Sequence, residues 1–140
     1  MAIDFSGAVK RLRAGQIVSE AGASAKIALY TGSIPATADT ALSGNTKVAE
    51  FTCNATSFGV VSGSGNNAVL TLSALTDANN QTTAIATGTV SFFRILKANG
   101  TTVVAQGTVG TSAADLILNN AVFAVGDLVQ ILLNGVITEA

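Results

Sequence analysis

Eight carboxylates and one thiol are the side chains of this chain that acid–base or nucleophilic chemistry would use first. The carboxylates are Asp4, Glu20, Asp39, Glu50, Asp77, Asp115, Asp127 and Glu139, and the thiol is Cys53. Two carboxylates in one cleft can act as general acid and base, as in glycoside hydrolysis. Nothing in their spacing singles out such a pair, and Asp residues at loop ends usually serve turns. The carboxylates therefore predict turns more than an active site.

Histidine is absent from the chain. It is the commonest general base and metal ligand, so a Ser–His–Asp triad, a Cys–His pair and the usual structural zinc sites are impossible. Asp77, Asn79 and Asn80 could offer oxygen ligands to calcium, but they lack the acidic density and fixed spacing of a known calcium loop. We therefore expect no catalytic residue, no cofactor and no metal site. We expect Cys53 to be an inert core thiol.

The composition limits the partners of this 140-residue chain. Charged residues make up 11% and hydrophobic residues 49%, whereas charged residues are usually about 25%. A net charge of −1 argues against nucleic-acid binding, and the basic residues within 10–13 are interpreted as a solvated helix face. No apolar run reaches the roughly 18 residues of a membrane helix, and no signal-peptide pattern opens the chain. Either much of the surface meets other protein, or neutral polar groups keep a small β domain soluble.

The elements of the fold are organised around residues 89–108, where two apolar runs flank Asn99-Gly100. This dipeptide predicts a β-hairpin with a type I′ turn. Leu96 should then face Val103, Ile95 should face Val104, and Gln106 should share the face of Phe93 and Ile95. Both faces carry large apolar groups, so the hairpin should lie inside a sheet or between layers. Arg94, in the middle of a strand, needs a structural partner or a neighbouring subunit.

The rest of the chain predicts one helix and a series of short strands. The helix is expected over 4–21, with Phe5, Val9, Leu12 and Val18 near one face. Strands are expected at 25–31, 46–54, 68–75, 115–118, 121–125 and 128–138, with a long loop at 32–45 around Pro35 and a polar loop at 76–83. This pattern predicts a mainly β fold, a β-sandwich or jelly-roll-like barrel of about seven to nine strands with a short N-terminal helix. Residues 1–24 would form a helical arm and residues 25–140 the β-sandwich domain.

Several segments together resemble a group of small virion proteins of tailed bacteriophages. They are ALYTGSIPATADTALSG (28–44), AEF (49–51), SFG (57–59), GTVSFFRILKANGTTVVAQGTVGTSAADLILNN (88–120) and GDLVQILLNGVIT (126–138). The shared pattern runs from a short helix through Y-[ST]-G-x-x-P and [FW]-[FW]-R to G-T-V-G-x-x-x-A-D-L. These motifs are structural, and the group has no catalytic residue to carry over.

The resemblance implies a non-enzymatic structural protein of the virion. We extend it to a capsid decoration, or cement, protein that is made in the host bacterial cytoplasm and sits on the capsid surface. Its partners would be the major capsid protein and copies of itself in a homo-oligomer, with no nucleic acid and no membrane. The contact residues would be Phe5, Val9, Leu12, Val18, Pro35 and Arg94, with Asn99 and Gly100 as a structural turn. The alternative is a tail or fibre-associated domain that binds a host receptor or glycan.

Overall fold

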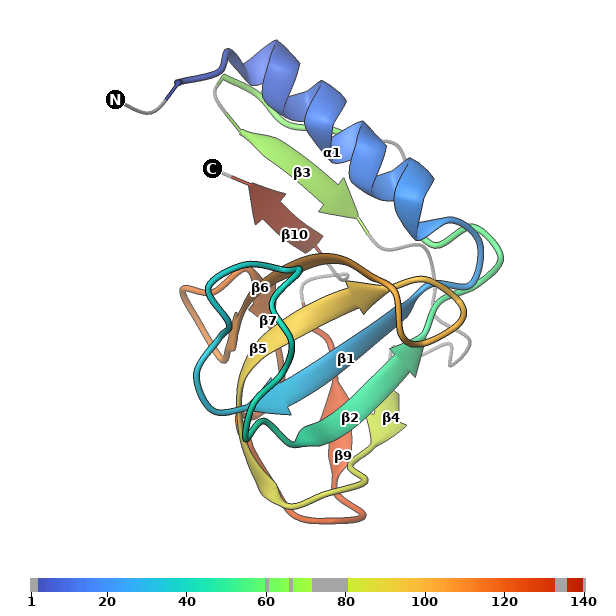
Figure 1. Ribbon diagram of the computed structural model, residues 1–140, viewed down its shortest axis with the longest axis vertical. Helices are drawn as coiled ribbons and strands as arrows, with labels where there is room; N and C mark the ends of the chain where they lie inside the picture. The colour runs from blue at the N-terminus through green and yellow to red at the C-terminus, as the bar shows by residue number, and fades with distance from the viewer. Residues whose placement is uncertain (1–2, 60, 66, 72–80, 133–135, 140) are drawn as a thin grey trace.

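The fold is mainly β with one N-terminal helix, as the sequence predicts (Figure 1). The computed structural model describes residues 3–59, 61–65, 67–71, 81–132 and 136–139. Helix α1 (Gly7–Ala21) precedes ten strands: β1 (Lys26–Thr31), β2 (Lys47–Thr52), β3 (Ala68–Thr71), β4 (Gln81–Thr83), β5 (Gly88–Leu96), β6 (Val103–Gly110), β7 (Leu116–Ile117), β8 (Val122–Phe123), β9 (Leu128–Gln130) and β10 (Val136–Glu139). The strands form a curled sheet with two shorter ribbons, consistent with a barrel or sandwich-like fold.

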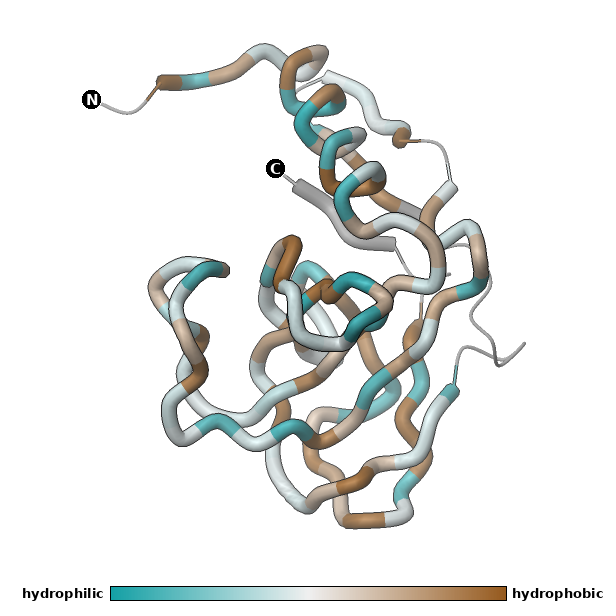
Figure 2. Tube along the Cα trace, turned by 45° about the vertical axis from the view of Figure 1, so that its right-hand side comes forward, coloured by the Kyte–Doolittle hydropathy of each residue, from teal (hydrophilic) through white to brown (hydrophobic). Residues whose placement is uncertain are grey.

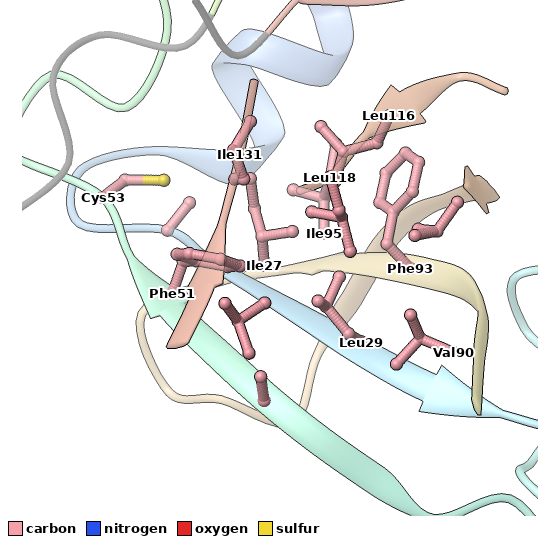
Figure 3. Packing of buried hydrophobic residues seen from close by; sticks show 14 of the residues in the cluster. Ile27, Leu29, Phe51, Cys53, Val90, Phe93, Ile95, Leu116, Leu118 and Ile131 are labelled. Atoms are coloured by element: carbon pink, nitrogen blue, oxygen red, sulfur yellow. The ribbon is translucent and has the colours of Figure 1, made fainter. Parts of the chain in front are cut away.

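The main sheet has the order β2-β1-β5-β6-β7, and β8 also pairs with β5. Its pairings are antiparallel except for β6 with β7. One face of the sheet points into the core, because alternate residues of a strand point to the same side. Figure 3 shows Ile27, Leu29 and Ile95 from this face meeting Leu118 and Ile131 from later segments.

The opposite face of the main sheet is also apolar, as the hairpin sequence predicts. Ala28, Tyr30, Phe92 and Leu96 are buried there. The Tyr30 and Phe92 rings stack with their centroids 5.3 Å apart. The segment 32–45 passes in front of β1 and β5 in Figure 1 and covers this second apolar face.

Helix α1 lies over the ribbon formed by β3 and β10, at the upper end of the molecule in Figure 1. Ser6 caps its start by accepting a hydrogen bond from the Val9 amide at 3.3 Å. At its end the Gly22 amide donates to the Val18 carbonyl, and Gly22 adopts the positive φ of +67° that closes many helices. The helix therefore ends at the predicted residue 21, and the cap at Ser6 explains why it starts at Gly7 and not at residue 4.

The turn at Asn99-Gly100 forms, but it is not the predicted type I′ turn. Type I′ needs positive φ at both central residues, and of this pair only Gly100 has one, at +74°. The Gly100 amide donates to the Lys97 carbonyl at 2.9 Å. The Asn99 side-chain oxygen accepts from the amides of Thr101 and Thr102, each at 3.0 Å. Asn99 thus stabilises the turn through its side chain.

The predicted hairpin register is correct for the residue pair beside the turn and wrong for the pairs beyond it. Leu96 faces Val103 as expected, but Ile95 faces Ala105 because the register shifts by one residue between them. The extra residue of such a bulge moves everything after it to the opposite face. Gln106 therefore lies opposite Arg94, not on the core face with Phe93.

Two strand predictions near the C-terminal half are also corrected. The single strand expected at 128–138 is two strands, β9 paired with β4 and β10 paired with β3. Gln81–Thr83, expected to belong to a polar loop, forms β4, which pairs with β9 and places Thr82 opposite the buried Val129. The predicted strand beyond Thr71 and the polar loop at 76–80 lie outside the described residues.

Candidate interaction site

The outer surface of the N-terminal segment carries an apolar stripe exposed to solvent. It consists of Ile3, Phe5, Val9 and Leu12, which we call the helix stripe. Leu12 is 71% exposed and Ile3 79% exposed, while Phe5 and Val9 are more than one third exposed. The Arg13 guanidinium lies over the Phe5 ring, 5.0 Å from its centroid. The chain leaves this stripe largely uncovered, and Figure 2 shows brown hydrophobic positions along α1 interleaved with teal ones.

The helix turns charged residues toward its own protein, against the usual pattern. Lys10 is only 9% exposed and its ammonium lies 3.9 Å from the Asp4 carboxylate. Arg11 donates from Nη1 to the carbonyls of Gly65 and Asn67, at 3.3 and 3.2 Å. Surface helices normally bury their bulky apolar residues and expose their charges. The prediction that residues 10–13 form a solvated face is therefore wrong for Lys10.

The inward face of α1 carries small and β-branched side chains, and its backbone comes very close to the chain beneath it at Gly7. Ala14 and Ala21 are buried in the core, and Val18 packs against it. A Cβ built on Gly7 would lie 1.8 Å from the Gly65 carbonyl oxygen. Of the four helix-side residues predicted to contact a partner, Val18 thus belongs to the chain's own core, whereas Phe5, Val9 and Leu12 stay available.

Arg94 and Pro35, the other predicted contact residues, meet through Gln106. Arg94 is 4% exposed and donates from Nη2 to the Thr40 carbonyl at 2.7 Å and from Nε to Gln106 Oε1 at 3.2 Å. Gln106 in turn donates from Nε2 to the Pro35 carbonyl at 2.8 Å. These bonds fasten the segment 32–45 onto the sheet. Of the two alternatives for Arg94, a structural partner or a neighbouring subunit, the structure therefore shows a structural partner within the chain.

The sequence did not indicate Gln106 as part of this arrangement. The predicted register placed Gln106 and Arg94 on different faces of the sheet. The bulge between Ile95 and Leu96 makes them cross-strand neighbours on the same face. Further bonds hold the same segment at its ends. Asn45 Nδ2 donates to the Thr31 carbonyl at 2.7 Å, and the Ser91 hydroxyl donates to the Gly32 carbonyl. The segment therefore presents a fixed surface despite having no regular secondary structure.

A second exposed apolar surface lies at the other end of the molecule. It consists of Ile85, Val122, Val125 and Leu128, each at least 50% exposed, and we call it the lower rim. These residues come from the connection between β4 and β5 and from the segment around β8 and β9. The lower loops include brown hydrophobic positions in Figure 2. The sequence does not indicate this surface, because the apolar residues within 121–125 predict only a strand.

Cys53 and several of the carboxylates have structural roles within the chain. Cys53 is buried, and this burial raises the pKa of its thiol to about 11. Glu50 lies 2.8 Å from Lys47 Nζ and 3.6 Å from Lys26 Nζ, and its hydrogen bond raises the pKa of Lys47. Asp115 accepts hydrogen bonds from the amide and hydroxyl of Thr108. No cluster of three potential metal ligands occurs among the described residues.

The aromatic side chains are nearly all internal. Six of the seven are buried: Tyr30, Phe51, Phe58, Phe92, Phe93 and Phe123. Phe5 is the exception, at 37% exposed. Sugar-binding sites commonly stack sugar faces on exposed aromatic rings, and the described surface has no such platform.

Comparisons with known proteins give no relative for this chain. No protein-family model, no curated protein and no solved structure matches it. Within the described residues, α1 is too short and too polar to cross a membrane.

Proposed function

We propose that this chain is a non-enzymatic structural protein of a tailed-bacteriophage virion, a decoration or cement protein on the capsid surface. Its partners are the major capsid protein and copies of itself. The observation that carries the proposal is the helix stripe, where Leu12 faces solvent while Lys10 of the same helix faces the protein. A helix that exposes its bulky apolar residues gains stability when another protein covers them.

The surface properties of the chain fit a protein that works in many copies. Charged residues are only 11% of the sequence, and each exposed apolar surface consists of about four side chains. A single contact of this size is weak, but contacts repeated over a shell add up through multivalency. Weak, repeated contacts would resist internal pressure on a capsid without any one of them being tight.

The chemistry of the chain supports a role without catalysis. The thiol of Cys53 is buried, and the carboxylates of Glu50, Asp115 and Asp127 accept hydrogen bonds from their own chain. With no histidine in the sequence, a general base near neutral pH would have to be an unusually perturbed group. The alternative, a tail or fibre domain that binds a receptor or glycan, has less support because the aromatic rings are internal.

The proposal is tested by adding purified protein to capsids that lack it. Deleting the helix would remove the buried Ala14 and Ala21 and disturb the fold, so single surface substitutions are needed. Leu12→Glu places a charge in the helix stripe, and Ile34→Glu places the same charge on an exposed apolar residue of another surface. We expect Leu12→Glu to reduce capsid occupancy at least tenfold at equal concentration, with Ile34→Glu close to the unmodified protein. Full occupancy by a folded Leu12→Glu variant would contradict the proposal.

A further inference from the structure

The hairpin turn between β5 and β6 contains the pair Asn99-Gly100, whose chemistry the proposed function does not use. An asparagine followed by glycine can lose its side-chain amide without an enzyme. The glycine nitrogen attacks the asparagine Cγ, and glycine has no side chain to hinder that attack. Asn99 is exposed to water, which the reaction also needs. The turn on which the hairpin depends therefore carries a reactive pair.

The reaction at this pair has two balanced steps. The Gly100 nitrogen forms a bond to Asn99 Cγ, the Cγ–Nδ2 bond breaks, and Nδ2 leaves as ammonia with the proton that Gly100 gives up. Water then opens the resulting five-membered ring at one of its two carbonyls. The product is either an aspartate at position 99 or an isoaspartate, in which the main chain runs through the side chain. Both products add one negative charge to the chain.

The folded turn holds the two reacting groups apart. The Gly100 amide donates to the Lys97 carbonyl at 2.9 Å, so its nitrogen keeps its proton while this bond lasts. Asn99 Oδ1 accepts from the amides of Thr101 and Thr102, each at 3.0 Å. Asn99 Nδ2 donates to Thr102 Oγ1 at 2.7 Å. These bonds direct the side-chain amide toward residues 101 and 102, and they must break before Cγ can reach the Gly100 nitrogen.

From this geometry we infer that Asn99 is a site of spontaneous deamidation that the folded turn protects, so that modification takes place in molecules whose turn has opened. Exposed turns open locally more often than the whole protein unfolds. Backbone donors on a carbonyl oxygen can also favour attack, because they stabilise the charge that develops there. The Lys97 bond decides against that effect here, since the nucleophile is not free. The inference does not depend on the proposed function.

The two products differ in what they do to the hairpin. An aspartate at position 99 keeps a side-chain oxygen for the amides of Thr101 and Thr102, and its charge strengthens those bonds. An isoaspartate adds a methylene carbon to the backbone of the turn and cannot keep the bond between Gly100 and Lys97 in its present geometry. Chains with aspartate should therefore refold to the same structure, whereas chains with isoaspartate should be less stable.

Peptide mapping by mass spectrometry measures the modification at position 99 directly. The full chain is incubated at mildly alkaline pH, folded in buffer and unfolded in guanidinium chloride, and the fraction with an acid at residue 99 is followed over time. We expect the folded protein to be modified at least tenfold more slowly than the unfolded chain. Asn134-Gly135, a second such pair in the sequence, is the internal standard in guanidinium chloride, where both pairs should react at similar rates.

A matched pair of variants assigns the protection to the bonds of the turn. Thr102→Val removes the hydroxyl that accepts from Asn99 Nδ2, whereas Thr101 meets Asn99 through its backbone amide, which Thr101→Val keeps. We expect Thr102→Val to raise the rate in the folded protein at least threefold and Thr101→Val to leave it unchanged, with equal rates for all chains when unfolded. The inference is overturned by a folded rate that equals or exceeds the unfolded rate, and also by equal folded rates for the two variants.

Discussion

At the scale of single residues, Arg94 connects two parts of the chain that sequence reasoning treated separately. Its guanidinium donates to Gln106 and to the Thr40 carbonyl, and Gln106 reaches the Pro35 carbonyl. A buried donor or acceptor that loses its partner costs more than a hydrogen bond usually contributes. The order of the middle of the segment 32–45 therefore depends in part on this side chain.

Replacing Arg94 by Met should loosen that segment while leaving the sheet formed. It leaves the Thr40 carbonyl and Gln106 Oε1 without the donor, so we expect the free energy of unfolding to fall by about 1–3 kcal/mol. Amides within 32–45 should also exchange hydrogen faster. The control is Asp39→Asn, an exposed change in the same segment, which should stay within about 0.5 kcal/mol. Equal stability of both variants would show that the arrangement contributes nothing.

Gly100 tests the conformation of the hairpin turn. Its φ of +74° strains most side chains, and a β-branched one most of all. Gly100→Val should lower the free energy of unfolding by about 1–3 kcal/mol. Gly100→Asn should cost clearly less, because Asn tolerates this region. If urea unfolding gave the same loss for both variants, backbone conformation would not be the cause.

Cys53 and Lys47 predict how stability responds to alkaline pH. Burial raises the Cys53 pKa to about 11 from 9.0, and the Glu50 hydrogen bond raises the Lys47 pKa above 10.5. Both groups hold their proton more tightly when folded, so their stabilisation is complete below pH 9 and is lost as pH rises through the folded pKa values. The urea midpoint should be level from pH 7 to 8.5 and fall between pH 9 and 11. Cys53→Ala should reduce that fall; an unchanged slope would contradict the role of the thiol.

At the scale of elements, α1 is the element whose orientation decides the proposed function. Its backbone at Gly7 approaches the turn before β3 so closely that a Cβ would not fit there, and Arg11 donates to two carbonyls of the same turn. This arrangement directs Leu12 outward. The helix is thus both part of the chain's own core and the carrier of an exposed apolar stripe.

Two glycines of α1 make a matched pair for testing this packing. Gly7→Ala introduces a Cβ 1.8 Å from the Gly65 carbonyl oxygen, so the helix must shift and unfolding should become easier by about 1–3 kcal/mol. Gly15→Ala meets nothing within 4 Å and should stabilise the protein by about 0.5–1 kcal/mol. Thermal unfolding of both variants measures these changes in stability. Stabilisation by both changes would mean that the helix does not pack this closely.

The elements also show how far sequence reasoning reaches. Alternation in 46–54 correctly placed Ala49, Phe51 and Cys53 on the core side, because one face of β2 is buried. The bulge after Ile95 was not visible, since Val104 and Ala105 are both apolar and either could face the core. The outward position of Leu12 was not visible either. It depends on carbonyls near residue 65, more than fifty positions away.

At the scale of the whole molecule, the structure combines a well-packed β core with apolar surfaces at both ends. The core explains how a chain with 11% charged residues folds, but the exposed stripe and rim add nothing to that core. Their burial would come only from neighbours. Under the proposed function, neighbouring proteins of the shell would cover them.

Counting the copies of this protein in purified virions tests the central claim most directly. Quantitative mass spectrometry, with the major capsid protein as internal standard, gives the ratio of the two chains. A decoration protein is repeated over the capsid surface, so we predict hundreds of copies per particle and their loss from capsids carrying the Leu12→Glu variant. Finding the protein in only a few copies at the tail, or absent from purified particles, would contradict the account.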